Sequence, residues 1–290
     1  MKTLRKIFTE EIAFVFSCPA LLWECIFLYL PLLVLALYSF FEFSVQTNSW
    51  VFTLHYYRQV FHSLYFRVIL NSLKLASVAT LICFTIAYPV AYFLAIKVQK
   101  RFRTFLLFSL ILPSWTSLVV QIYAWFFLLE QDGLVSRTLH WIGFIPKSMH
   151  LLNNYFSIMV GLVSCFLPFM ILPIYVILDK MDPRLLEASA DLGADKIETF
   201  KRIIFPLSLP GVYTGFLLVF VPVFGEFAIP SLLGGSTYVV WGGLIVDKFL
   251  RARDWPFGSA LAIVGIMLFV LIILSFIAIG KLLKRLRGVN

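Results

Sequence analysis

The sequence has 290 residues, of which 61% are apolar and only 13% are charged, and its mean hydropathy is +0.94. A soluble domain carries about 25% charged and about 45–50% apolar residues, so the excess apolar surface here must face lipid. The net charge of +9 does not indicate nucleic-acid binding, because the Lys and Arg residues gather at the ends of apolar runs without exposed aromatic residues between them. The composition therefore predicts an integral membrane protein and no nucleic-acid partner.

The first segment, 1–19, is predicted to be a basic cytosolic lead-in rather than a signal peptide. Glu10 and Glu11 interrupt the apolar region that a signal peptide needs, and no small-x-small cleavage site follows.

Six apolar runs come next, each long enough to cross about 30 Å of hydrocarbon, which takes about 20 helical residues. Helices are expected because an isolated apolar run in lipid must satisfy its own backbone hydrogen bonds. We predict an all-α, six-helix transmembrane bundle with spans over 20–42, 67–96, 104–129, 156–178, 210–233 and 257–280.

The basic residues predict which side each loop faces. With both termini in the cytosol, 16 of the 24 Lys and Arg residues lie on the cytosolic side and 7 on the outer side, in agreement with the positive-inside rule. In this topology four tryptophans lie at the outer membrane boundary, where the amphipathic indole is favoured. They are Trp50, Trp141, Trp241 and Trp255.

Prolines predict that several of these helices are bent. Each proline removes a backbone donor, which is tolerated in a membrane where neighbouring helices or a cavity satisfy the backbone. Such a bundle suits a transport path better than a simple anchor. Gly211 and Gly215 form a GxxxG pattern, which we interpret as close packing within the chain. The prolines in or near spans are Pro31, Pro89, Pro113, Pro168, Pro173, Pro222 and Pro230.

Cysteine and histidine spacing predicts no metal site. The cysteines lie in or beside apolar segments without CxxC spacing and are interpreted as small core residues. The histidines fall in polar connecting stretches without a helical HxxxH pair.

The predicted cytosolic loop over 179–209, between the fourth and fifth spans, has a structure of its own. Asp182, followed by Pro, is a helix start, and Gly193 suits the left-handed conformation that ends a helix. Asp195 resembles the first residue of a capping box for a second helix that we expect to stop at Pro206. The apolar face of this helix-turn-helix must be covered by the chain's own helix ends or by another protein, and the spacing leaves both open.

The same loop resembles the EAA loop of type I ABC importer permeases. The family pattern is Glu-Ala-Ala, three residues, Gly, nine residues, then Ile-x-Leu-Pro. This chain has Ser in place of the second Ala and Phe in place of Leu. The family's loop forms a coupling helix in a groove of the ATPase subunit, so the resemblance implies the same role for the matching residues. They are Glu187, Ala188, Ser189, Gly193, Ile203 and Pro206.

The resemblance extends over about residues 50–280 and is to the spermidine/putrescine permeases in particular. It implies a permease domain over 67–280, preceded by a first helix with its periplasmic loop over 20–66 and followed by a basic cytosolic tail over 281–290. It also implies polyamine import across the bacterial inner membrane. The alternative is a permease for another small solute, such as an amino acid, iron, thiamine or an opine. The motifs that carry the likeness are Pro113–Ser117, Leu167–Met170, Gly225–Pro230, Leu233–Gly235 and Arg253–Gly258.

The chain lacks a G-x-x-x-x-G-K-[ST] sequence with which to cradle a nucleotide phosphate. We therefore expect no enzymatic activity and no cofactor here, with ATP on a partner subunit. The resemblance implies a cytosolic dimer of ABC ATPases, a second permease subunit, a periplasmic substrate-binding protein and the lipid bilayer as partners.

Two other classes of membrane protein fit the sequence less well. A stand-alone secondary transporter usually has two related halves, and no internal repeat is evident in this sequence. A membrane-embedded enzyme would need a clustered polar constellation, which the dispersed histidines do not provide. Copurification with an ATPase would favour the permease interpretation over the secondary transporter and the membrane-embedded enzyme.

Glu226 is the sharpest candidate for the substrate path. It lies in the outer half of the predicted fifth span, where an unpaired carboxylate costs several kcal/mol and marks a functional site. It could offset the desolvation of polyamine ammonium groups, with Trp115 or Tyr123 adding cation–π contacts. Alternatively, Glu226 neutralises Lys74 or accepts backbone N–H groups freed by the prolines.

Four acidic residues are predicted to face outward: Glu130, Asp132, Asp247 and Asp254. Exposed ion pairs contribute only about 0–1 kcal/mol, so we interpret these residues as solvated contacts rather than as a receptor for a cation or a binding protein. Asp254 is expected to cap the turn near Pro256.

Overall fold

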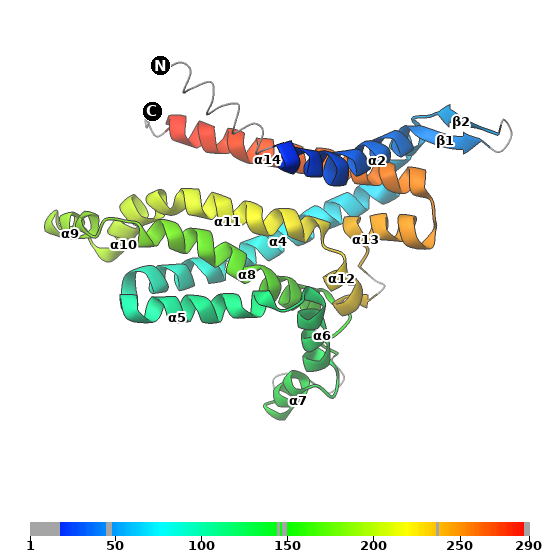
Figure 1. Cartoon of the computed structure of the whole chain (residues 1–290). Helices are drawn as coiled ribbons and strands as arrows, with labels where there is room; N and C mark the ends of the chain where they lie inside the picture. Colours follow the sequence, from blue (N-terminus) through cyan, green and yellow to red (C-terminus); the bar gives the residue numbers. More distant parts are fainter. Residues whose placement is uncertain (1–17, 45–47, 144–145, 147–149, 236–237, 287–290) are drawn as a thin grey trace, which may run out of the picture. The chain divides into compact units, whose positions relative to one another are not determined.

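The computed structural model describes residues 18–44, 48–143, 146, 150–235 and 238–286, and these are mostly helical (Figure 1). The predicted lead-in over 1–19 lies almost entirely outside the described residues, as does the end of the predicted tail over 281–290. The expected six-span helical fold is confirmed. The helices long and apolar enough to cross a membrane are Cys18–Phe40, Ser63–Lys97, Leu118–Trp141, Tyr155–Asp179, Lys196–Gly225 and Trp255–Ser275.

The chain forms two compact units, of which the first comprises 1–66 with 245–270. Its core is a small aromatic cluster around Phe257, which is fully buried. The rings of Tyr56 and Tyr65 are centred 6.0 and 5.1 Å from the Phe257 ring. The helices are η1 (Cys25–Tyr29), α2 (Leu30–Phe40), α3 (His55–Val60), η6 (Asp247–Arg251) and the start of α14 (Trp255–Leu286).

A β-hairpin follows the first helix of this unit. Strands β1 (Phe41–Ser44) and β2 (Ser49–Phe52) pair antiparallel, with Phe41 opposite Phe52. The first predicted span, 20–42, therefore ends early, at Phe40. Strands are not predicted here from the sequence, although the aromatic residues on both strands favour cross-strand pairing.

The turn before α14 is closed by Asp254, as predicted. Its Oδ1 accepts a hydrogen bond from the backbone N–H of Phe257 at 3.3 Å, and its own N–H donates to the carbonyl of Lys248 at 3.0 Å. Partial burial, with a contribution from the nearby carboxylates of Glu42 and Asp254, raises the pKa of Tyr56 to about 12. Asp254 is thus a structural residue of this turn.

The second unit comprises 67–244 with 271–290 and contains most of the membrane-spanning helices. Long helix α4 (Ser63–Tyr92) enters it and continues through the wide turn η2 (Phe93–Lys97). The elements that follow are α5 (Lys100–Ile111), η3 (Leu112–Trp115), α6 (Leu118–Leu129), α7 (Leu134–Trp141), α8 (Tyr155–Asp179), α9 (Arg184–Asp191), α10 (Lys196–Thr199), η4 (Phe200–Ile204), α11 (Phe205–Gly225), α12 (Ala228–Leu233) and α13 (Trp241–Val246).

Helices α8 and α11 lie side by side and form the centre of this unit (Figure 1). A Cβ atom added at Gly211 would lie 2.6 Å from the carbonyl oxygen of Pro173, and one added at Gly215 would lie 2.8 Å from Sδ of Met170. The GxxxG pattern therefore packs α11 against α8 of the same chain, as predicted.

The third predicted span, 104–129, is divided rather than continuous. Helix α5 ends at Ile111, the turn η3 follows, and α6 begins only at Leu118. With 12 residues, α5 is about 18 Å long and does not cross the hydrocarbon by itself. Pro113, which removes a backbone donor at this point, accounts for the break.

The fifth predicted span, 210–233, is also displaced. One continuous helix runs from Lys196 through α10, η4 and α11 to Gly225, and the short helix α12 follows after a break. The expected stop at Pro206 is wrong: Pro206 lies in the first turn of α11 directly after the wide turn η4, where a missing N–H is tolerated. Pro222 likewise lies inside α11 without ending it.

Trp241 does not lie at a lipid boundary, in contrast to the prediction. It is 1% exposed, and its backbone N–H donates to Oγ of Ser72 at 2.7 Å. The start of α13 is drawn inward because Gly242 lies directly against the backbone of Gly225. Trp141, by contrast, is 89% exposed.

Replacing Gly211 with Val should destabilise the second unit by about 1–3 kcal/mol, the usual cost of overpacking, because the new side chain meets backbone atoms of α8. A lower thermal unfolding midpoint of the purified chain would report the loss. Gly243→Ala is the matched control, since its Cβ would lie 3.6 Å from the nearest atom. An unchanged midpoint for Gly211→Val would contradict the close packing of α8 and α11.

Candidate functional site

The loop over 179–209 forms the helix-turn-helix that its sequence predicts. Oδ1 of Asp182 accepts a hydrogen bond from the N–H of Arg184 at 3.0 Å, at the start of α9. Gly193 ends α9 with a φ of +79°, in the left-handed region. Oδ1 of Asp195 then accepts from the N–H of Glu198 at 2.6 Å and caps α10. The side chain of Glu198 pairs with Arg202 at 2.9 Å rather than closing a capping box.

Ser189 has a role that sequence reasoning missed. It is 5% exposed, and its Oγ lies 2.8 Å from Oγ1 of Thr199, so a hydroxyl pair joins α9 to α10. The backbone carbonyl of Ser189 also accepts from the N–H of Ala194 at 3.1 Å, next to the turn at Gly193. The Ser that departs from the EAA pattern therefore fixes the angle between the two short helices. The polar residue Thr199, ten positions further on, is the sequence signal for it.

The apolar face of the loop is divided between self-packing and exposure. Ile204 is 2% exposed, and the Phe200 ring is centred 5.6 Å from that of Tyr88 on α4. In contrast, Leu192 is 88% and Ile197 64% exposed. The base of the loop is thus packed on the chain itself, whereas its tip presents apolar side chains outward.

The six residues singled out by the EAA pattern accordingly occupy different environments. Glu187 and Ala188 are exposed on α9, Ile203 and Pro206 are half-buried where the loop joins α11, and Gly193 is exposed at the tip. The structure therefore brings Glu187, Ala188 and Gly193 onto an accessible surface together with Leu192 and Ile197.

Glu226 lies in the break between α11 and α12. Its side chain is half-buried, and Oε1 accepts hydrogen bonds from the N–H groups of Ala228 at 2.7 Å and Ile229 at 3.3 Å. These are N–H groups at the start of a helix, which no helical carbonyl can satisfy. The ion pairs within the described part of the chain do not join Glu226 to Lys74, which is exposed. Of the alternatives for Glu226, the acceptance of backbone N–H groups is confirmed, although these groups are free because they begin α12 and not because a proline removed their partners.

Trp115 and Tyr123 lie on either side of the other break, between η3 and α6. Trp115 is 73% exposed with its ring edge-on to Phe108, and Tyr123 is 45% exposed. Between them, Nε2 of Gln121 donates to the carbonyl of Pro113 at 2.6 Å and contacts Oγ1 of Thr116 at 3.1 Å. Gln121 therefore closes the break that Pro113 opens.

The three path candidates are not in mutual contact. Within the described residues no hydrogen bond, ion pair or ring contact joins any two of Glu226, Trp115 and Tyr123. Their elements are neighbours, however, because α12 packs against α6 (Figure 1). The two helix breaks thus lie in the same part of the second unit.

Two of the acidic residues that are predicted to face outward, Asp132 and Asp247, form exposed ion pairs. Asp132 lies 3.7 Å from Arg137, and Asp247 lies 3.6 Å from Arg251, both as exposed pairs. In the part of the chain that the structure describes, no three His, Cys, Asp or Glu side chains come together as metal ligands.

Comparison with known proteins identifies the family of this chain. Residues 87–288 match the family described as the binding-protein-dependent transport system inner membrane component. The chain belongs to this family and is a multi-pass protein of the inner membrane.

Two relatives are similar to this chain over most of its length. The spermidine/putrescine transport system permease protein PotB of Escherichia coli strain K12 is 39% identical over 264 residues, covering 91% of this chain and 96% of the relative. PotB of Haemophilus influenzae is 37% identical over 287 residues and covers 98% of both chains.

A solved bacterial ABC transporter involved in the import of the acidic polysaccharide alginate has the same fold. One of its chains matches with a TM-score of 0.70 at 18% identity, covering 97% of this chain and 99% of that one.

The capping role of Glu226 can be separated from its charge. Glu226→Ala should cost about 1 kcal/mol, the usual loss for a helix cap, and should speed amide hydrogen exchange at Ala228 and Ile229. Glu226→Gln keeps a carbonyl acceptor and should leave exchange nearly unchanged. The control is Glu130→Ala, a substitution at an exposed position on the predicted outer side. Equal exchange rates at these two amides in Glu226→Ala and in the unchanged chain would contradict the capping role of Glu226.

Proposed function

We propose that this chain is one permease subunit of an ABC importer that carries spermidine or putrescine across the inner membrane. The observation that carries the proposal is the 37–39% identity, over nearly the whole chain, to permease proteins named for spermidine/putrescine transport. The alginate transporter supports the fold alone, because its identity is only 18%. A type I permease for another small solute remains the alternative function.

The loop over 179–209, which we call the coupling loop, is proposed to bind an ATPase. Its tip exposes apolar residues Leu192 and Ile197 beside Glu187, and a solvated loop gains nothing from leaving such side chains uncovered. We expect a dimer of ABC ATPases on the cytosolic side to cover them, with ATP bound there and no cofactor on this chain. A second permease subunit completes the path.

A periplasmic substrate-binding protein is proposed to deliver the polyamine to the outer loops. One solved alginate transporter that shares this fold, with a TM-score of 0.70, is in complex with an alginate-bound periplasmic protein. This supports a partner of the same kind here.

The continuous helix from Lys196 to Gly225 is proposed to link the two functional regions. Its 30 residues span about 45 Å at 1.5 Å per residue. It begins within the coupling loop and ends at the break that holds Glu226. A displacement of the loop on ATP binding would therefore move the break between α11 and α12 as part of one rigid element.

Glu226 is proposed to serve the path with the carboxylate oxygen that the cap does not use. Oε1 accepts both N–H groups of α12, while Oε2 accepts no hydrogen bond from the described residues and is free for an ammonium group. The exposed rings of Trp115 and Tyr123 would add cation–π contacts, each contributing about 0.5–2 kcal/mol. This arrangement fits a cation and not an anionic solute.

Transport is tested with the full complex of permeases, ATPase and binding protein in vesicles. We expect uptake of spermidine or putrescine driven by ATP, and a lower rate for Glu226→Gln, which keeps the cap but loses the charge. Uptake of an amino acid, iron or thiamine in place of a polyamine would refute the substrate. Unchanged polyamine affinity and rate in Glu226→Gln would remove Glu226 from the path.

Gly193→Val tests the coupling loop. The left-handed conformation costs a residue with a Cβ about 1–2 kcal/mol, and no atom lies within 4 Å of the added Cβ, so the substitution acts on the turn alone. Insertion should be intact and transport-linked ATP hydrolysis lost, whereas Gly193→Asn should retain more of it, because Asn tolerates this conformation.

A matched control exists at Gly143, which has a φ of +76° and likewise no atom within 4 Å of an added Cβ. Gly143→Val therefore introduces the same strain away from the loop, and ATP hydrolysis should stay coupled to transport. Normal coupling in Gly193→Val would overturn the role of this turn.

A further inference from the structure

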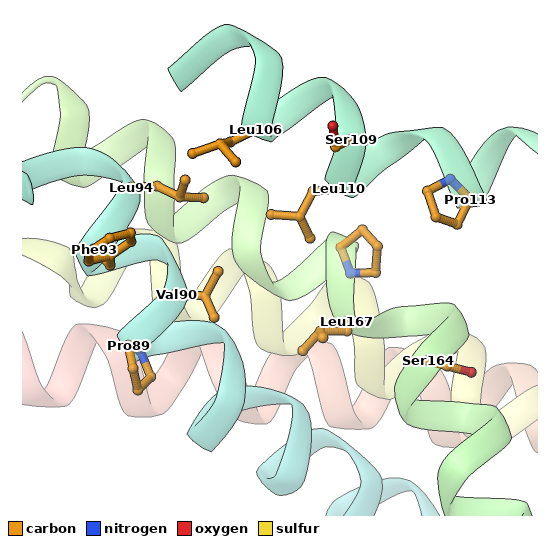
Figure 2. A pocket seen from close by; sticks show the side chains of 11 residues that line it. Pro89, Val90, Phe93, Leu94, Leu106, Ser109, Leu110, Pro113, Ser164 and Leu167 are labelled. Atoms are coloured by element: carbon orange, nitrogen blue, oxygen red, sulfur yellow. The ribbon is translucent and has the colours of Figure 1, made fainter. Parts of the chain in front are cut away.

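An open apolar groove of about 740 Å³ lies within the second unit, between α4 with its extension η2, α5, and α8 (Figure 2). Figure 2 shows Leu106 and Leu110 of α5 on one side, with Val90 and Leu94 on the other. Helix α4 with η2 and helix α8 are membrane-spanning segments, and α5 contacts η2 beside them. Hydrocarbon rather than water is therefore the expected environment of the groove.

Helix α5 stands away from the rest of the unit at this groove. None of its residues is buried, and Phe105 is 68% exposed. Protein interiors and interfaces are close-packed, with few voids larger than a water molecule. An apolar space of this size is therefore filled in the membrane by a molecule of apolar chemistry.

One end of the groove is strongly basic. Lys97 lies one helical turn beyond Leu94, and Arg103 lies one turn before Leu106. Arg103 is engaged, since it pairs with Asp179 and its Nε donates to the carbonyl of Val98 at 2.8 Å.

Three further basic residues lie at this end of the groove. Lys97, Lys100 and Arg101 are all exposed, and none of them takes part in an ion pair within the described residues. The positive-inside rule places them at the cytosolic surface. An apolar groove that ends in three unpaired cations matches a molecule with an apolar tail and an anionic head.

We propose that this groove binds an anionic phospholipid of the inner leaflet, with an acyl chain between α5 and Val90 and Leu94, and the phosphate on Lys97, Lys100 and Arg101. Basic pockets between membrane helices on the cytosolic side bind lipid headgroups by this chemistry. A helix of the second permease would also fill the groove, but it would leave the cations without a counter-charge. The lipid holds α5 in place, and with it the η3 turn that carries Trp115.

Native mass spectrometry of the assembled complex, with phosphatidylglycerol and phosphatidylcholine as probes, tests the headgroup contact. Each basic residue near an anionic lipid surface contributes about fivefold in binding, so removing three should weaken phosphatidylglycerol binding about 100-fold. The variant is Lys97→Gln with Lys100→Gln and Arg101→Gln. The control, Lys281→Gln with Lys284→Gln and Arg285→Gln, removes the same charge from the predicted cytosolic tail and should retain the lipid.

A second variant tests the groove itself. Leu106→Trp should fill it and displace bound phosphatidylglycerol, whereas Leu274→Trp, at a position on α14 that is 59% exposed, should not. A phosphatidylglycerol with a photoreactive group in its acyl chain should label peptides of α5, and Leu106→Trp should abolish the labelling.

Three results would overturn the proposal. The first is equal retention of phosphatidylglycerol by the basic-residue variant and its control. The second is equal binding of phosphatidylcholine, because it would show no charge recognition. The third is loss of the second permease from Leu106→Trp with phosphatidylglycerol retained, which would assign the groove to a subunit interface. None of these results bears on whether the complex transports polyamines.

Discussion

A helix that breaks inside a bilayer leaves backbone N–H and C=O groups without partners, and there is no water in the hydrocarbon to replace them. This chain meets the constraint with polar side chains at the breaks. The amide of Gln121 donates to the carbonyl of Pro113, and the carboxylate of Glu226 accepts the N–H groups that begin α12. Backbone satisfaction therefore accounts for the polar side chains found at both breaks.

The packing of α11 determines how these breaks relate to the coupling loop. Gly211 and Gly215 let α11 approach α8 closely, and the hydroxyl of Tyr88 on α4 lies 2.9 Å from Oγ of Ser208. The base of the loop is fixed to the same helices through Phe200. The tip of the loop, by contrast, exposes the apolar side chains of Leu192 and Ile197.

Much of the chain's apolar surface remains uncovered. The apolar window of helix Cys18–Phe40 has no buried residue, and α5 has none along its whole length. In a membrane such faces are covered by lipid or by other subunits. The exposed apolar tip of the coupling loop differs, because the predicted topology places it outside the hydrocarbon, where lipid does not cover it.

Local signals in the sequence predict the number of spans, the helix-turn-helix of the coupling loop and the role of Asp254, since apolar run length, Asp caps and a left-handed Gly each depend on a few neighbouring residues. The sequence leaves two interpretations of Glu226, a substrate-path residue or a structural residue, and no local pattern distinguishes them. The coupling residues were predicted from the resemblance to the EAA loop, and the path residues from the position of a carboxylate within a predicted span.

Tertiary structure decided where the helices bend and which polar residues serve the bends. Pro113 interrupts its helix, whereas Pro206 and Pro222 do not, because the effect of a proline depends on whether neighbouring groups satisfy the backbone it leaves open. Likewise, Trp241 is buried rather than interfacial since Gly242 lies against Gly225. Such contacts join residues far apart in the chain, and no periodicity or composition in the sequence encodes them.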